Sequence, residues 1–283
     1  MASVINTNIA SLNSQRALNK TQNSVNTAIQ RLSSGLRVNS SKDDAAGLAI
    51  ADRMSSQIRG MNVAIRNAND AISLAQVADG ALGQISDMAQ RMRELAVQSA
   101  NATNSTVDRA SLNQEFQELA KEIDRTLNAT KFNGKAILAG DAGSTKTFQI
   151  GAGTESIDRI SISGADLTTN PAITAVTTGL AITGADATSS RAAITALDSL
   201  LTTINSQRAI YGAVQNRFEA VVSGLQVSVE NQTAARSRIM DADFAAETAN
   251  LTSAQVLQQA GQAMLAQANS APSGVLALLR NLS

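Results

Sequence analysis

Long apolar stripes with helical spacing run through most of this sequence. One stripe starts at Leu18 and recurs at seven-residue intervals to Leu32, and a second extends over residues 58–96 with a single change of phase. No proline interrupts either stripe. Such long periodic patterns are typical of paired helices, in which each seam is buried against another helix. Further stripes occur at residues 112–127, 194–229 and 257–282.

Turn and cap residues predict where the helices begin and end. The run Ser33-Ser34-Gly35 predicts the end of the first helix. Ser41 is the expected N-cap of the second helix, with the carboxylates of Asp43 and Asp44 near the positive end of the helix dipole. Asn133-Gly134 marks the exit from a third helix, and helix is expected to resume at Arg191.

The middle of the chain has a different composition. Residues 135–190 are rich in Thr, Ser, Gly and Ala, and alternation at residues 147–150 and 157–162 predicts a small β element. We expect the rest of this region, to about residue 190, to be a surface excursion without a core of its own.

Together these patterns predict a mainly α fold: a long antiparallel helical bundle or coiled-coil rod with a small β element and a short variable outer region. Aromatic residues make up only 2 % of the chain, which suits narrow helical seams. We expect residues 1–42 to pair with 246–283, residues 43–135 to form a long-helix bundle with 190–245, and 136–189 to form the β element and variable surface region. The terminal pair has few core layers, so neighbouring subunits are expected to order it through an assembly seam. Its expected members are Leu18, Val25, Ile29, Leu32, Leu257, Met264, Val275 and Leu278.

Composition excludes several functions. Lysine plus arginine and aspartate plus glutamate both total 23, and this balance argues against nucleic acid as a partner. The chain has no cysteine and no histidine, so thiolate and imidazole chemistry are impossible. We expect no catalytic residues, no cofactor and no metal. The first ten residues do not form a secretory signal peptide, and no window is apolar enough to predict a membrane span.

Two short motifs have a functional and a structural interpretation. Asp43-Asp44 could be a carboxylate pair, but adjacent helical positions diverge by about 100° and do not share a face. Capping is therefore the favoured interpretation. Gly151-Ala-Gly153 is a fragment of a phosphate loop at most, and a turn is favoured.

Several segments near both ends of the chain resemble bacterial flagellins. The similarity covers roughly residues 1–135 and 190–283, and the middle resembles no family. At the N-terminal end it is carried by residues 4–10, by 30–51 (QRLSSGLRVNSSKDDAAGLAIA) and by 90–98 (QRMRELAVQ). At the C-terminal end it is carried by residues 211–218 (YGAVQNRF), 235–244 (ARSRIMDADF) and 256–261 (VLQQAG).

The resemblance implies a subunit that self-assembles into an extracellular flagellar filament for swimming motility. Its terminal helices would line an inner tube and the long-helix bundle an outer tube. It also implies export without a cleaved signal, and as partners an export chaperone, the cap and the hook-junction proteins.

The resemblance further assigns a receptor site to Arg91, Leu95 and Glu115, where a vertebrate Toll-like receptor would bind. Residues 30–51 resemble a segment sensed by plant immune receptors. The alternative for the first set is a solvated helix face, with Arg91 and Glu115 outward and Leu95 at the seam edge.

Three other functions remain as alternatives. A hook-filament junction protein has similar terminal helices, and a helical adaptor rod has similar seams, although it does not require signatures at both ends. An enzyme in the variable region is the third alternative, but the lack of histidine excludes the metalloprotease that some flagellins carry there.

Overall fold

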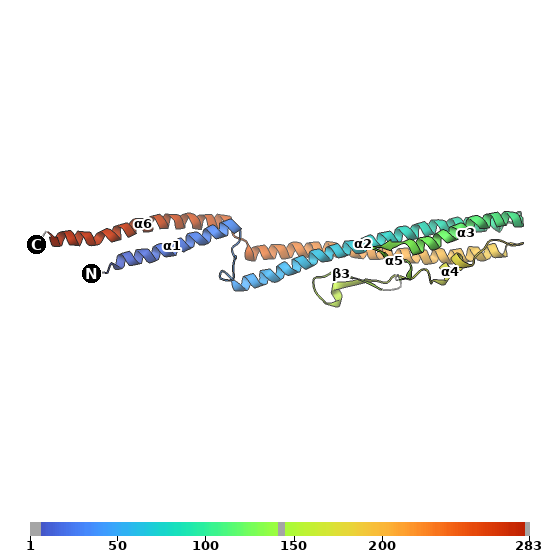
Figure 1. The fold of residues 1–283 in the computed structure, drawn as a ribbon, viewed down its shortest axis with the longest axis horizontal. Helices are drawn as coiled ribbons and strands as arrows, with labels where there is room; N and C mark the ends of the chain where they lie inside the picture. Colours follow the sequence, from blue (N-terminus) through green and yellow to red (C-terminus); the bar gives the residue numbers. More distant parts are fainter. Residues whose placement is uncertain (1–6, 141–144, 281–283) are drawn as a thin grey trace. The chain divides into compact units, whose positions relative to one another are not determined.

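The computed structural model describes residues 7–140 and 145–280 (Figure 1). Side chains are described through residue 270. The fold is mainly helical, as predicted, and contains α1 (Ile9–Ser34), α2 (Ala45–Ser99), α3 (Thr106–Ala129), α4 (Pro171–Thr178), α5 (Thr188–Met240) and α6 (Phe244–Arg280). Two compact units can be distinguished. The terminal unit comprises residues 1–56 and 231–283, and the central unit comprises residues 57–230.

Local sequence explains the ends of the first two helices. Gly35 ends α1 in the left-handed conformation (φ 71°), and its amide donates to the carbonyl of Arg31 at 2.8 Å. The prediction of Ser41 as the cap of α2 is wrong. Asp44 takes this role by accepting the amide of Gly47 at 2.8 Å, because Asp43 is already used as the acceptor for the Ser40 amide and hydroxyl in the preceding turn. The two carboxylates therefore cap and brace the turn.

The central unit packs α2 against α5 in antiparallel fashion. Asp79 accepts from Arg208 at 2.9 Å, and further along α2 Arg93 donates to Asp198 at 2.7 Å, so numbering rises on one helix as it falls on the other. Small residues on α2 let the helices approach closely, and larger side chains of α3 and α5 fill the remaining space. Fully buried members include Ala68, Ala71, Ala75, Ala78, Leu82, Ile85, Phe116, Ile123, Leu197, Ile204 and Phe218.

Two antiparallel hairpins follow α3. Strands β1 (Lys131–Phe132) and β2 (Lys135–Ala136) are joined by Asn133 and Gly134, both with positive φ (48° and 76°), as the tight hairpin turn requires. Strands β3 (Lys146–Gln149) and β4 (Arg159–Ile162) pair with Phe148 opposite Ile160, close to the predicted strands. Phe148 packs edge-on against Phe218 at 5.7 Å between ring centres, which joins this hairpin to α5.

The segment before α5 differs from its prediction as a surface excursion. Leu167, Ile173, Val176 and Ile182 are all essentially buried and belong to the same apolar core as α2 and α5. Their spacing gave little periodic signal, because only the 8-residue helix α4 is regular and the other buried residues lie in irregular chain. This segment completes the core of the central unit.

The terminal unit contains α1, α6 and the two connections that lead from α1 to α2 and from α5 to α6. These connections are hydrogen-bonded to each other. Leu36 forms an isolated β-bridge with Asp241, the Arg37 amide donates to Met240 at 2.7 Å, and the Ala242 amide donates to Gly35 at 2.9 Å. The Arg37 guanidinium also donates to the carbonyl of Ile239 at 2.6 Å.

Candidate assembly surface

Polar contacts set the register between α1 and α6. Near one end of the pair, the Asn8 side chain donates to the carbonyl of Ala268 and the Ser11 hydroxyl donates to Asn269, both at 2.7 Å. Midway along, Gln258 donates to Gln22 at 2.6 Å. From Asn8 to Gln22 the partner on α6 moves back from Ala268 to Gln258, so the pair is antiparallel, and a shift by one turn would break these contacts.

Between the polar contacts the seam is built from small side chains. Val25 and Ala28 of α1 and Ala254 of α6 are buried, and Gly261 leaves room for Leu18, whose Cδ1 lies 3.5 Å from where a Cβ on residue 261 would be. Small residues allow the two helices to lie close together but bury little apolar area. At about 25 cal/mol per Å² of buried apolar surface, such a seam contributes little stability per helical turn.

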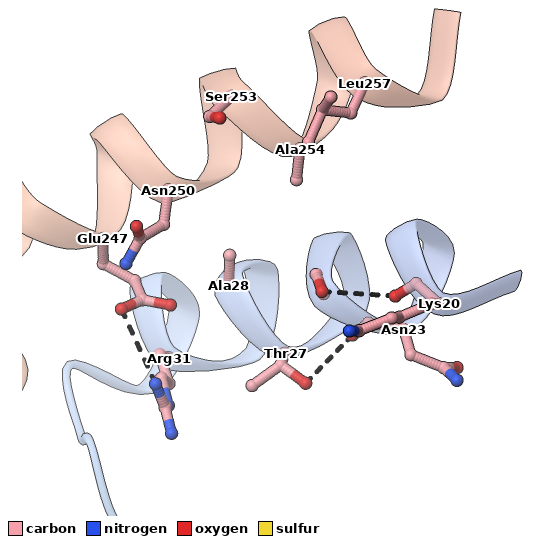
Figure 2. A pocket seen from close by; sticks show the side chains of 11 residues that line it. Lys20, Asn23, Thr27, Ala28, Arg31, Glu247, Asn250, Ser253, Ala254 and Leu257 are labelled. Atoms are coloured by element: carbon pink, nitrogen blue, oxygen red, sulfur yellow. Dashed lines mark hydrogen bonds and ion pairs between the residues drawn. The ribbon is translucent and has the colours of Figure 1, made fainter. Parts of the chain in front are cut away.

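A polar groove of about 520 Å³ runs between the two helices at the end nearer the connections (Figure 2). Figure 2 shows Arg31 of α1 and Glu247 of α6 facing each other across this groove, with Asn250 and Thr27 beside them. Arg31 Nη1 lies 3.7 Å from Glu247 Oε2. Glu247 is buried, and the Nε of Arg31 is buried without a hydrogen-bond partner. This ion pair links α1 to α6 without burying large apolar side chains.

The structure divides the predicted seam residues into three groups. Val25 is buried, and Leu18 and Leu32 are partly buried in the contact between α1 and α6. Ile29, Leu257 and Met264 are 50 %, 58 % and 65 % exposed. Val275 and Leu278 lie beyond residue 270, where the described side chains end.

The exposed group results from a rotation of the seam by one residue. Gln258 and Leu265, both partly buried, occupy the positions that we expected for Leu257 and Met264. Leu257 and Met264 instead line a second groove, of about 410 Å³, together with Leu18 and Ala260. Other exposed apolar side chains of this unit are Ile9, Leu12, Ile50, Phe244 and Val256. The terminal pair thus holds small and polar residues inside and several of its large apolar residues outside.

The residues assigned to receptor recognition lie in the central unit. Arg91 of α2 donates to Glu115 of α3 at 2.9 Å and to Glu94 at 3.0 Å, and all three side chains are about half exposed or more. These hydrogen bonds, first that to Glu115, raise the pKa of Arg91. Leu95 is 1 % exposed and packs in the core, so it does not form a surface patch with the two charges. The expectation that it lies at the seam edge is wrong for this reason.

Residues 7–140 and 145–280 contain no cluster of three or more carboxylates that could hold a metal ion. Within the same ranges, no helix has a stretch that is both long and apolar enough to cross a bilayer.

A well-filled helical unit joined to a helical pair with large exposed apolar side chains is typical of a subunit that assembles through its ends. Comparison with known proteins identifies the family. Residues 5–142 match the bacterial flagellin N-terminal helical region and residues 194–279 match the bacterial flagellin C-terminal helical region. The chain belongs to the bacterial flagellins.

Two relatives match over nearly the whole chain, and a solved structure matches over part of it. A flagellin of Halalkalibacterium halodurans is 44 % identical over 278 residues, which cover 98 % of this chain and 100 % of the relative. Flagellin FlaB2 of Treponema pallidum is 42 % identical, with 98 % and 100 % covered. The crystal structure of Bacillus cereus flagellin is 32 % identical and covers 56 % of this chain and 88 % of its own, with a TM-score of 0.48.

The family assignment settles the function at the level of the family. The protein is a structural subunit of the bacterial flagellar filament, acts in motility, and is not an enzyme. The predicted flagellin identity is confirmed over the junction-protein and adaptor alternatives.

Proposed function

We propose that this flagellin polymerises through the outward apolar residues of its terminal pair, and that α1 and α6 of neighbouring copies pack side by side as an inner tube. The observation that supports this is the exposure of several large apolar side chains in the terminal unit. Leu257 and Met264 line the second groove, Leu257 also lines the polar groove, and both side chains are more than half exposed. Burying each side chain against another copy would contribute about 1.5–3 kcal/mol.

In the proposed arrangement, residues 1–42 and 246–283 form the inner filament core, and residues 43–135 with 190–245 form an outer tube. Residues 136–189 carry the β element and the outer surface. The assembly seam comprises Val275 and Leu278 in addition to the exposed residues, because they continue the same stripe toward the end of α6.

Substitution within the stripe tests this proposal. Leu257→Asp or Met264→Asp should stop seeded polymerisation, because an unpaired charge would be placed in a contact between copies. The matched control is Gln262→Asp, an exposed position on the same helix with the same introduced charge. Sedimentation measures polymer, and circular dichroism checks that the monomer stays helical. Normal filaments from both apolar variants would show that this face is not an assembly surface.

The proposal extends to partners and location. The filament lies outside the cell, and the subunit leaves through the flagellar export channel without a cleaved signal. An export chaperone would cover the C-terminal segment before export, and the cap and hook-junction proteins would contact the ends of the polymer. Support comes from the exposed apolar residues of α6, which need cover until the subunit assembles. Co-purification of the wild-type chain and of Leu257→Asp with a candidate chaperone would test this contact.

Host receptors are the last proposed partners. We assign Arg91 and Glu115 to contact with a Toll-like receptor, since both are accessible, and Leu95 to support of their helix from the core. A receptor-reporter assay should show lower potency for Arg91→Ala than for wild type. Lys121→Ala, an exposed cation on α3 in a comparable surface ion pair, is the control. Equal potency of wild type and Arg91→Ala would remove this assignment.

Residues 30–51 are the corresponding candidate for a plant receptor, tested with a synthetic peptide.

A further inference from the structure

Residues 180–184 are held by the central unit in an unusual way. They lie between α4 and α5, and residues 180–183 belong to no helix or strand. Three side chains at four-residue intervals on α3 bond to this segment through its main chain. Gln117 donates to the Leu180 carbonyl at 2.6 Å, Asn113 accepts the Ile182 amide at 3.0 Å, and Arg109 donates to the Gly184 carbonyl at 3.1 Å.

The spacing of these contacts has a simple geometric basis. Four residues of an α-helix rise about 6 Å, and two residues of extended chain span about 6.6 Å. A helix with polar side chains at i, i+4 and i+8 therefore matches alternate residues of an extended chain that runs alongside it. Contacts at residues 180, 182 and 184 fit this repeat, with the numbering falling on α3 as it rises along the segment.

The centre of the segment has a further contact. The Ser99 hydroxyl, at the end of α2, donates to the Ile182 carbonyl at 2.7 Å and accepts from the Ser190 hydroxyl at 3.0 Å. The Ile182 side chain is fully buried in the core. Ile182 thus has its amide, its carbonyl and its side chain all bound, and it anchors the segment.

Arg109 completes the site. It is 3 % exposed, and its guanidinium donates to the carbonyls of Ser99 at 3.0 Å, Asn101 at 3.3 Å and Gly184 at 3.1 Å. A buried cation that is satisfied by three carbonyls joins the end of α2 to the segment. Its charge is also one of the smaller causes that lower the pKa of Asp186, after the Thr188 amide and hydroxyl.

We propose that Gln117, Asn113, Arg109 and Ser99 form a peptide-binding groove that takes an extended chain through its main chain and one aliphatic anchor, and that residues 180–184 are its resident ligand. The groove lies inside the region that matches the N-terminal flagellin description (5–142), whereas its ligand lies outside both matched regions. Recognition through the main chain allows the bound sequence to vary while its path is kept.

The direction of each hydrogen bond, donor or acceptor, gives a direct test in the full-length chain. Asn113 serves as an acceptor, so Asn113→Asp should keep the segment bound and Asn113→Ala should not. Gln117 serves as a donor, so Gln117→Glu should release the Leu180 carbonyl. Amide exchange of residues 180–184 should accelerate about five- to tenfold in the releasing variants, as expected for the loss of one hydrogen bond. Gln114→Ala, an exposed amide on the same helix, should change nothing. Exchange equal to wild type in both Asn113→Ala and Gln117→Glu would show that these main-chain contacts do not hold the segment and would overturn the proposal.

A second experiment asks whether the groove binds a peptide in trans. The full chain with Ile182→Gly is titrated with a labelled peptide of residues 178–186, and with the same peptide N-methylated at the isoleucine. We expect saturable binding to the variant, at least tenfold weaker binding to wild type, and at least fivefold weaker binding of the N-methylated peptide. Equal binding to wild type, or no binding to a variant that keeps its helical signal, would overturn the proposal. If the variant loses that signal, the exchange series decides.

Discussion

The terminal and central units differ in how they treat their large apolar side chains. In the central unit, Leu82, Phe116 and Phe218 are fully buried against one another's helices. In the terminal unit, Glu247 and Ser11 are buried while Leu257 and Met264 are exposed. Both units are built from long paired helices with similar stripes, so the difference teaches that a stripe predicts a buried seam without saying whether its partner lies in the same chain.

The largest contrast should come from the same charge placed in both units. Leu82→Asp should lower the free energy of unfolding of the central unit by more than about 4 kcal/mol, because the carboxylate would be buried without a partner. Met264→Asp should leave the monomer within about 0.5 kcal/mol of wild type, since residue 264 is exposed. Chemical denaturation followed by circular dichroism measures both. A similar loss in both variants would contradict the comparison.

The segment before α5 should behave as core. Ile173→Ala should destabilise the central unit by about 2–4 kcal/mol, because it removes buried methyl groups and leaves a cavity. Ile157→Ala, at a position 82 % exposed in the turn between β3 and β4, is the matched control and should have little effect. Deletion of residues 165–188 should destabilise the monomer for the same reason. Unchanged stability of Ile173→Ala would restore the surface interpretation.

Hydrogen exchange should separate the two units in the dilute monomer. Amides of residues 9–32 and 257–270 should exchange at least about tenfold faster than those of α3, because the terminal seam buries few apolar groups and opens locally. Polymerisation should slow them. Strong protection of these residues in the monomer would mean that the terminal pair is stable without neighbouring copies.

The ion pair across the terminal groove should have a smaller effect. A double-mutant cycle with Arg31→Gln and Glu247→Gln should give a coupling energy of about 0.5–1 kcal/mol, since the pair is partly buried and its atoms are 3.7 Å apart. The Arg91–Glu115 pair of the central unit, which is more exposed, should give less. A coupling energy near zero would mean that only the uncharged hydrogen bonds set the register of α1 against α6.

The smallest expected effect is that of pH. Hydrogen bonds from the Ser40 and Ser105 hydroxyls lower the pKa of Asp43 and Asp108, one in each unit. A carboxylate with a lowered folded pKa stabilises above its ordinary value of about 3.9, and this stabilisation is lost as the pH falls through the folded value. The chain has no histidine, so the melting temperature should be flat between pH 5 and 8 and fall below about pH 4. A transition near pH 6 would contradict this.

Periodicity predicted the helices and their antiparallel pairing because seams of this length are strong signals. Gly35 located a helix end, whereas Asn133-Gly134, predicted as the exit from the third helix, form the turn between β1 and β2 beyond the end of α3 at Ala129. Both sites have positive φ values, which few other residues adopt. Ser41 failed as a cap because Asp44, directly before the helix, takes this role, while Asp43 accepts from Ser40 in the preceding turn. The stripe at Leu257 and Met264 was assigned one residue out of phase with the contact to α1, because Gly261 and Ala268 fit both registers.

Two features could not be predicted from pattern. Leu167, Ile173 and Ile182 are buried in irregular chain, where no period reports burial. The groove on α3 uses Arg109, Asn113 and Gln117, which by spacing alone look like a solvated helix face. Their four-residue interval was the available signal, but only the position of residues 180–184 gives it meaning.

The β-bridge between Leu36 and Asp241 has a mechanical consequence. One backbone connection leads from α1 to α2 and another leads from α5 to α6. The hydrogen bonds from Arg37 to Met240 and from Ala242 to Gly35 join these two connections. Tension on one connection is therefore shared with the other, because the hydrogen bonds between them hold the two connections together. In a filament subunit under load, these hydrogen bonds would have to break before the two connections could separate.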